Sequence, residues 1–325
     1  MIFTLFMNIF VLVFSAINLI SINAQGLRTD ERRQTAFNFF RRNKYDIIFL
    51  QETHWTQEKH FSIQQEWKGP ILLNDGIDSA CSVAILFSEK LDLKPEHVKC
   101  DSHGRTLATV ITIENLELNL VNIYAPRTDT ERRKFYMDLE NLLRPENNIL
   151  AGDLNSIDNA RMDKHGGNPH ARNSANKILS AVSSRNNLFD VWRNSRKTLR
   201  EYTWAGRNTR DNSIIRTRID KFLINRSLSP FVSKTSIKPY PNSDHDLITL
   251  NIDFTQQERG KGFWHFNNSL LADPIFAEEI TAFWTNWLKE KSKFKNPLKW
   301  WDKAKSHFKG IAIQRSTILC KIEQN

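Results

Sequence analysis

Polar side chains stand at the ends of several apolar runs in this sequence, where they could act together on one substrate. The set contains four carboxylates, two amides, one phenol and one imidazole: Asn23, Glu52, Tyr124, Asp153, Asn155, Asp220, Asp244 and His245. A hard divalent cation prefers carboxylate oxygens, an attacking water must lose a proton, and charge that develops on a phosphate needs hydrogen-bond donors. The residue types therefore favour metal-assisted hydrolysis of a phosphodiester.

The chemistry of each side chain indicates a separate role. Glu52 is the first candidate for a metal ligand. Asp153, oriented by the neighbouring Asn155, suits a group that holds and deprotonates a water. His245 and the Tyr124 hydroxyl can donate hydrogen bonds to the phosphate. Asp220 is a candidate for the carboxylate that fixes the tautomer of His245 and favours its charged form.

Each of these residues also has a simpler interpretation. His245 alone fits a histidine with an ordinary structural partner, Tyr124 before Ala-Pro fits a packing residue, and Asn23 fits a turn. Six separate apolar runs that each change to such a group are harder to attribute to chance. The combined set therefore carries the functional interpretation better than any one member.

The apolar runs themselves predict strands. Runs 17–23, 46–50, 116–124 and 148–151 lead into the polar set, whereas runs 218–224 and 243–250 begin with it. If all these polar ends share one rim, the last two strands run opposite to the others, so the sheets are mixed. Further strands are expected at 83–87 and 108–113, with a hairpin turn at Glu114-Asn115.

Three helices are expected between the strands, the third of them carrying Ile178, Leu179 and Val182. Thr29 or Asp30 caps the first, with Ala36, Phe37 and Phe40 on its buried face. We expect Arg32, Arg33, Arg41 and Arg42 to face outward. Thr128 and Glu131 form a capping box that starts the second helix.

The charge balance favours an acidic polymer as partner. Lys and Arg number 46 against 36 for Asp and Glu, a net charge of +10, although solubility alone would also explain this excess. A basic loop next to Asp220 could reach nucleic-acid phosphates, although such loops are more often solvated hairpins. Its arginines are Arg207, Arg210, Arg216 and Arg218. The 3 cysteines are too few and too far apart for a disulfide framework or a zinc site, which fits a reducing intracellular compartment.

The two ends of the chain differ from its middle. Residues 1–16 are almost wholly apolar, which leaves open a signal peptide, a membrane anchor or an incidental extension, although no Lys or Arg precedes the apolar stretch. Residues 256–262 form a polar, glycine-containing linker. Beyond it, Phe276, Ile280, Phe283 and Trp287 predict an amphipathic helix. The tail holds Trp264, Trp284, Trp287, Trp300 and Trp301 of the 9 tryptophans, so we expect it to pack on the main domain or on a segment beyond this chain.

Several motifs resemble those of the endonuclease/exonuclease/phosphatase superfamily, in the same order. They are Ser21 to Arg28, Leu50 to His54, Val121 to Pro126, Gly152 to Asn155, Arg218 to Asp220 and Ser243 to His245. The chain is more closely similar to the endonuclease domain of non-LTR (LINE-type) retrotransposon polyproteins, and Arg259 to Leu271 is similar to the segment that follows it. Ala24-Gln25 and Leu154 depart from the usual pattern without affecting an acid.

The resemblance implies a deoxyribonuclease I-like α/β fold, a four-layer sandwich of two mixed β-sheets flanked by helices, over residues 17–255. A linker and helical tail follow at 256–325. It also implies a Mg²⁺-dependent nick in double-stranded DNA, with Mn²⁺ as the alternative ion, whose free 3′ hydroxyl primes reverse transcription.

By motif match, Glu52 binds the metal and Asp244 lies near it. Asp153 with Asn155 activates the water, Asn23 and Tyr124 support the site, and Asp220 pairs with His245, which stabilises the phosphate. These catalytic roles are all implied by the resemblance.

The expected partners are DNA and either the element RNA or a reverse transcriptase segment outside this chain, with no stable membrane partner. We expect a truncated or domesticated fragment in the nucleus or another intracellular compartment, with the apolar N-terminus leaving a membrane or secreted location open. Alternatives are an apurinic-site repair enzyme, a secreted nuclease, another phosphoesterase of the superfamily, or a non-catalytic scaffold that binds nucleic acid.

Overall fold

The computed structural model describes residues 16–76, 81–91, 93–113, 116–167, 174–209, 211–254, 266–294 and 296–323. The chain divides into two compact units, Met1–Gln257 and Glu258–Asn325. Several predictions lie outside the described residues: the apolar extension up to residue 15, the turn at Glu114-Asn115, the loop residue Arg210, and the linker with the motif that follows it up to residue 265.

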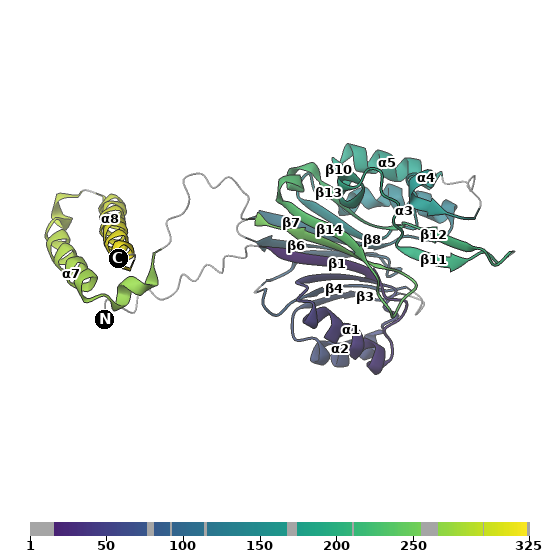
Figure 1. Ribbon diagram of the computed structural model, residues 1–325, viewed down its shortest axis with the longest axis horizontal. Coiled ribbons are helices and arrows are strands. Elements are labelled where there is room, and N and C mark those ends of the chain that lie inside the picture. The colour runs from purple at the N-terminus through teal and green to yellow at the C-terminus, as the bar shows by residue number, and fades with distance from the viewer. Residues whose placement is uncertain are drawn as a thin grey trace. The chain divides into compact units, whose positions relative to one another are not determined.

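The first unit contains two six-stranded sheets and a small third one (Figure 1). In spatial order, the first sheet has β14 (Val232–Lys238), β15 (Leu247–Ile252), β1 (Ile17–Asn23), β2 (Ile47–Gln51), β4 (Val83–Phe87) and β3 (Ile71–Asn74). The second has β10 (Leu188–Asp190), β13 (Asp220–Asn225), β8 (Asn148–Asp153), β7 (Leu116–Tyr124), β6 (Thr106–Ile113) and β5 (Glu96–Cys100). The third has β11 (Trp204–Arg207), β12 (Ile214–Thr217) and β9 (Lys164–His165).

Helices cover the outer faces of the two large sheets (Figure 1). They are α1 (Asp30–Arg42) and α2 (His60–Glu66) on the first sheet, and α3 (Asp129–Asp138) and α5 (Ala175–Arg185) on the second. Two short helices, α4 (Ala160–Asp163) and α6 (Val191–Ser195), lie in the connections around β9 and β10. Short 3₁₀ helices span Gln57–Lys59, Leu139–Leu142, Arg226–Phe231, Asn268–Ala272 and Lys291–Lys293.

Alternation along each strand divides the apolar side chains among three layers of core. Leu19 and Ile149 point between the sheets, whereas Ile20 packs under α1 and Leu150 packs under α3 and α5. Successive side chains of a strand point to opposite faces, so strands buried on both sides must be apolar throughout. The predicted four-layer sandwich of two mixed sheets is confirmed.

The strands run in the directions that we predicted from the positions of the polar residues. β1 is parallel to β2, and β7 is parallel to β8. β15 runs antiparallel to β1, and β13 runs antiparallel to β8. The ends of four strands and the starts of two others therefore meet at one rim of the sandwich, as we predicted.

Arg33 corrects one prediction about the first helix. Its side chain is fully buried, and its guanidinium contacts Glu66 at 2.5 Å and Asp30 at 2.8 Å. Residue 33 lies three, four and seven positions before Ala36, Phe37 and Phe40, so it shares their buried face. The positive charge of the side chain led us to place it outside, whereas its helical position places it inside.

The second unit is a pair of packed helices, α7 (Pro274–Lys289) and α8 (Pro297–Glu323). Asp273 caps α7 and also binds Arg315 of α8 at 2.6 Å. Aromatic side chains among the described residues of the tail contact one another within this unit, as Trp284 with Trp300 at 5.9 Å illustrates. A helix from later in the same tail supplies these contacts, a partner that our prediction of packing on the main domain or on a further segment did not include. In the part of the chain that the structure describes, no helix is long and apolar enough to span a membrane.

Candidate active site

An asparagine joins two carboxylates at the rim. Asn23 ends β1, and its Nδ2 donates to Glu52 Oε1 at 2.9 Å and to Asp153 Oδ2 at 3.2 Å. Glu52 follows β2 in the first sheet, whereas Asp153 ends β8 in the second. One buried amide therefore links acids from both sheets, which places them in a common site.

Glu52 is held as a carboxylate. Its backbone adopts a left-handed conformation, φ +48°, which turns the chain sharply out of β2. Although burial opposes ionisation, the nearby His54 ring, the Asn23 amide, the Tyr124 hydroxyl and the charge of Arg127 lower the pKa of Glu52 to about 2. An ionised, buried carboxylate is a suitable ligand for a hard cation.

Asp153 and Asp220 lie opposite each other on β8 and β13. Burial, and then the charge of Asp220, raise the pKa of Asp153 to about 7. A negative charge nearby disfavours the ionised form of Asp153. The pair therefore attracts a proton donor or a cation between its members.

His245 supplies positive charge beside the two acids. Its Nδ1 lies 2.9 Å from Asp220 Oδ2. Burial opposes the charged imidazole, but Asp220, Asp153 and Asp244 together raise the pKa of His245 to about 10. Its Nε2 is 3.9 Å from Asp153 Oδ2 and 3.8 Å from Asp244 Oδ1, beyond hydrogen-bond distance of both. A charged imidazole with such an Nε2–H can donate to a substrate oxygen.

Two hydroxyl side chains outside the predicted set align this pair. Thr203 Oγ1 accepts the backbone N–H groups of Ile219 and Asp220, each at 3.1 Å, and the Thr203 carbonyl accepts the N–H of Asp246. Ser243 Oγ donates to the Asn23 carbonyl at 2.7 Å and accepts the N–H of His245. Thr203 carries no signal in the sequence, because its role depends on three segments that meet only in the fold.

Tyr124 and Asn155 flank Asp153. Tyr124 is its neighbour across β7 and β8, and burial and the nearby Glu52 raise the pKa of the phenol, which keeps its proton. The Asn155 N–H donates to Asp153 Oδ1 at 2.8 Å, while its side-chain Nδ2 donates to the Ala125 carbonyl. Asn155 therefore fixes the carboxylate of Asp153, while Tyr124 lies between it and Glu52.

Asp244 lies at the open side of the site. Its Oδ2 accepts the indole N–H of Trp204 at 2.9 Å, and its side chain is partly exposed. The structure thus brings together the eight predicted rim residues, and adds Arg127 and His54 next to Glu52.

The predicted basic loop is split by the structure. Arg207 and Arg216 are exposed on the β11–β12 hairpin, which projects next to the rim (Figure 1). Arg218 is 1% exposed, and its guanidinium pairs with Asp163 at 2.8 Å and Asp190 at 2.7 Å. The prediction of a nucleic-acid contact is therefore wrong for Arg218, because its partners, distant in the sequence, hold it in the interior.

The acids offer a set of oxygens that fits a divalent cation. Asp153, Asp220 and His245 each place one potential ligand atom within 4.8 Å of the others. The raised pKa of His245 leaves no lone pair on its ring, so the available donors are oxygens. Asp220 Oδ1 is buried without a hydrogen-bond partner among the described residues. Oxygen ligands of this kind fit Mg²⁺ better than softer metals.

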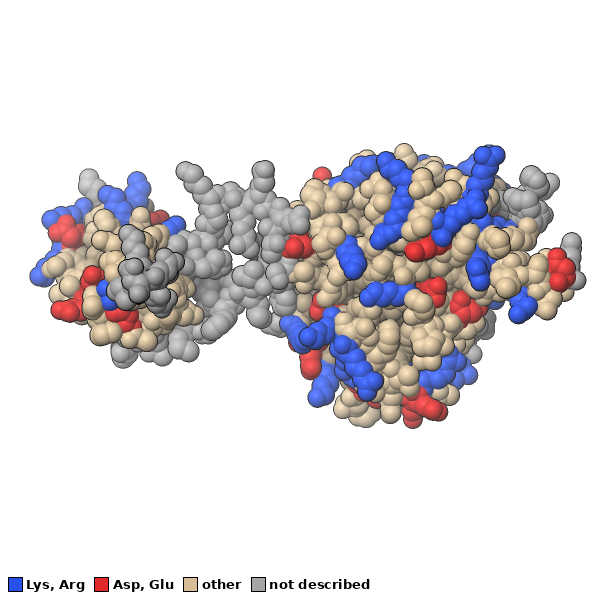
Figure 2. All heavy atoms as spheres, viewed as in Figure 1, with Lys and Arg blue, Asp and Glu red and all other residues tan. Residues whose placement is uncertain are grey.

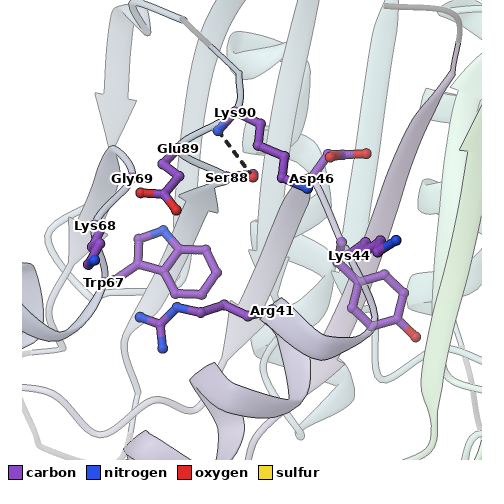
Figure 3. Close-up of a pocket in the computed structure, with 10 residues that line it drawn as sticks. Arg41, Lys44, Asp46, Trp67, Lys68, Gly69, Ser88, Glu89 and Lys90 are labelled. Carbon is purple, nitrogen blue, oxygen red and sulfur yellow. Dashed lines mark hydrogen bonds between the residues drawn. The ribbon is translucent and has the colours of Figure 1, made fainter.

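A separate pocket of about 250 Å³ lies away from these acids (Figure 3). Asp46 and Ser88, which line it, come just before β2 and just after β4, at the opposite end of the first sheet from Glu52. Arg41, Lys44, Lys68 and Lys90 also surround it. This pocket contains none of the predicted site residues.

Comparisons with known proteins agree with this geometry. Residues 17–245 match the model of the Endonuclease/Exonuclease/phosphatase family. The chain is 32% identical over 300 residues to the "Transposon TX1 uncharacterized 149 kDa protein" of Xenopus laevis, which covers 90% of this chain and 22% of that protein. The chain thus spans about a fifth of the length of this relative.

Two solved structures share the fold. The AP endonuclease LMAP from Leishmania major has a TM-score of 0.62 at 17% identity, covering 74% of this chain and 88% of that one. The endonuclease domain of TRAS1, a telomere-specific non-LTR retrotransposon, has a TM-score of 0.53 at 15% identity, covering 73% of this chain and 98% of that one. From β1 to His245, where the acids, amides and imidazole are assembled, this chain belongs to the Endonuclease/Exonuclease/phosphatase family.

Proposed function

We propose that this protein is a Mg²⁺-dependent endonuclease that nicks double-stranded DNA and leaves a 3′ hydroxyl for target-primed reverse transcription. The observation that carries the proposal is the buried amide of Asn23, which joins Glu52 to the Asp153–Asp220–His245 cluster. The similarity to a transposon protein and to a retrotransposon endonuclease domain supports this role over other phosphoesterase activities.

The roles follow from the protonation states. Glu52 would hold the Mg²⁺, with Asp244 nearby, and a bound Mg²⁺ would supply positive charge for the phosphoryl and leaving oxygens. Asp153, held by Asn23 and Asn155, orients the attacking water and accepts its proton. Burial and the charge of Asp220 raise the pKa of Asp153 to about 7, which suits a group that accepts a proton near neutral pH.

The developing negative charge meets two donors. The His245 imidazolium, fixed through Asp220, donates from Nε2 to a phosphoryl oxygen, and the protonated Tyr124 hydroxyl, which faces Glu52 before substrate binds, is the second donor. Both are fixed before substrate binds, so little reorganisation is needed during the reaction.

The surface charge fits a DNA substrate. On the face of the sandwich visible in Figure 2, Lys and Arg side chains outnumber those of Asp and Glu. We propose duplex DNA as the main partner, and the element RNA or a reverse transcriptase segment outside this chain as the others.

Nicking of supercoiled plasmid tests the proposal. With Mg²⁺ or Mn²⁺ the full chain should convert supercoiled DNA to open circles, and excess EDTA should abolish the reaction. A DNA polymerase should extend the nicks without prior phosphatase treatment, because the ends carry a 3′ hydroxyl. A parallel plasmid with abasic sites separates the repair alternative: cleavage only of that plasmid would assign the activity to repair, and binding without cleavage of either would leave a scaffold.

The exposed arginines of the hairpin give a separate prediction. The double change Arg207→Gln/Arg216→Gln should raise the KM for DNA several-fold at 0.1 M salt and leave kcat nearly unchanged, because phosphate contacts add binding but not chemistry. The slope of log K against log salt should fall by about 2. The double change Arg42→Gln/Lys44→Gln removes the same charge at the far end of α1 and is the control. Equal loss in both variants would assign the effect to net charge.

A further inference from the structure

The turn between α7 and α8 combines exposed apolar side chains with a high density of lysine. We name it the α7–α8 turn surface and define it by the following residues: Leu288, Lys289, Lys291, Lys293, Leu298, Lys299, Trp301, Lys303 and Lys305. None of these residues belongs to the family match, which ends at residue 245. The catalytic site therefore does not account for the α7–α8 turn surface.

The apolar part of the surface is open and fixed in place. Leu288 is 49% exposed, Leu298 71% and Trp301 37%. The Trp301 ring packs edge-on against Trp284, with centroids 5.9 Å apart, and lies 6.4 Å from Trp300. An indole held on one side by a rigid aromatic cluster and open on the other can stack on a flat ligand at little entropic cost.

The lysines of the α7–α8 turn surface carry largely uncompensated charge. Within the described residues, Lys289, Lys291, Lys299 and Lys303 form no ion pair, while Lys293 and Lys305 pair with acids on their own helical turns. Two lysines lie over rings of the cluster, Lys291 over Trp300 at 5.5 Å and Lys303 over Phe294 at 5.5 Å. Positive charge and aromatic surface are thus interleaved.

The opposite end of the same helix pair has the reverse character. Asp273, Glu278 and Glu279 lie in the residues that begin α7, and Asp273 is paired with Arg315. In Figure 2 the Lys and Arg side chains of this unit gather where α7 ends and α8 begins, toward the top of the view, and most of the visible acids lie toward the other end. The charge is therefore concentrated at the turn rather than spread over the unit.

We propose that the α7–α8 turn surface binds single-stranded nucleic acid, with phosphates on the lysines and bases stacked on Trp301. Phosphate charge complements the lysines, and every base has a flat face for the indole. A duplex satisfies the lysines but keeps its bases stacked on one another, so only a single strand uses both features of the surface. This binding is independent of the nicking chemistry.

Fluorescence anisotropy with the full chain in EDTA tests the proposal, because no strand can then be cut by a metal-dependent reaction. The probes are a labelled 15-nucleotide RNA, DNA of the same sequence, and the corresponding DNA duplex. Trp301→Ala should weaken binding of both single strands about tenfold or more and change duplex binding by less than about twofold. Lys291→Gln/Lys299→Gln/Lys303→Gln should weaken single-strand binding and lower its salt slope by about 2, the value for three phosphates on a flexible strand.

Two matched controls make the result specific. Leu271→Ala removes an exposed apolar side chain near the other end of the helix pair, and Lys44→Gln/Lys68→Gln/Lys90→Gln removes three lysines from the pocket in Figure 3. Both should leave single-strand binding within about twofold of the parent. All variants should keep the parental rate of plasmid nicking, so failure here and failure of the proposed endonuclease are separate outcomes.

Several results would overturn the inference. Unchanged single-strand affinity in Trp301→Ala removes the stacking site, and equal losses in the control triple variant reduce the effect to net charge. Binding of anionic phospholipid vesicles that depends on Trp301, without single-strand binding, would assign the surface to a membrane. A difference between the RNA and DNA probes would identify which strand the surface prefers and would support the proposal for that strand.

Discussion

Asp153→Asn should lower the single-turnover rate of plasmid nicking about 10³-fold or more and leave DNA affinity within a few-fold. The substitution keeps the shape of the side chain but removes the carboxylate that accepts the proton of the attacking water. Asn23 donates to Asp153 Oδ2 at 3.2 Å, and the Asn155 N–H donates to Asp153 Oδ1 at 2.8 Å. The NH₂ group of an asparagine at position 153 would replace one of these acceptor oxygens and would face one of the two donors. Nicking at saturating protein, with binding measured separately, checks the separation of chemistry from affinity.

The same change should stabilise the metal-free fold. The folded-state pKa of Asp153 is raised above its usual value, to about 7, so above that pH the ionised side chain opposes folding. Asp153→Asn should therefore raise the free energy of unfolding at pH 8 by about 1–3 kcal/mol, with less gain at pH 5, where the acid already carries a proton. Asp138→Asn, the same substitution at an exposed helix end, is the control and should change neither property. A variant that is both inactive and unstable would show that Asp153 maintains the fold.

The rim could be predicted because strands encode it locally. A buried strand is apolar on both faces, so the residue where it turns polar marks a sheet edge, as at Asp153 and Glu52. Around Asp220 and His245 the polar residues come before the apolar ones, and this reversed order correctly predicted that β13 and β15 run antiparallel to β8 and β1. What made these inferences reliable is that each needs only the residues next to it.

Long-range polar partners could not be predicted in the same way. Arg33 and Arg218 carry charges that suggest solvent, but Glu66 lies 33 residues from the first and Asp163 lies 55 residues from the second. No local pattern identifies such partners, and each contact exists only after the chain has folded. Thr203 has the same character, because its hydroxyl gains a role from the approach of β13.

Arg218 is the buried charge with the largest expected effect on the fold. Its guanidinium joins α4 to the start of α6 through Asp163 and Asp190, and it lies 5.2 Å from the Trp192 ring. Arg218 lies two residues before Asp220, and its backbone N–H also donates to the Asp163 carbonyl. The cluster therefore fixes the segment that presents Asp220 to His245.

Arg218→Met should lower the free energy of unfolding by about 3–5 kcal/mol, the usual effect of removing one partner from a buried ion pair. Arg216→Met, two residues earlier on an exposed side, is the matched control and should stay within about 0.5 kcal/mol of the parent. Burial opposes the ionised form of Asp163, but Arg218 and Arg193 hold its pKa below the usual value. The stabilisation of the fold by the ionised Asp163 is present above the usual aspartate pKa of about 4 and is lost as pH falls through the lower folded-state pKa. The difference in free energy of unfolding between the parent and Arg218→Met should therefore shrink in acid.

A second substitution tests whether the cost is that of an unpaired charge. Arg218→Met alone leaves the buried carboxylate of Asp163 without one of its positive partners. In Arg218→Met/Asp163→Asn that negative charge is removed as well, so the free energy of unfolding should fall by less than the sum of the two single changes. Urea unfolding of all four proteins at pH 7 measures this coupling. Strict additivity would mean that Arg218 acts through packing on Trp192 alone. If nicking by the folded fraction of Arg218→Met also falls, the cluster positions Asp220 as well as stabilising the fold, because no atom of Arg218 belongs to the rim.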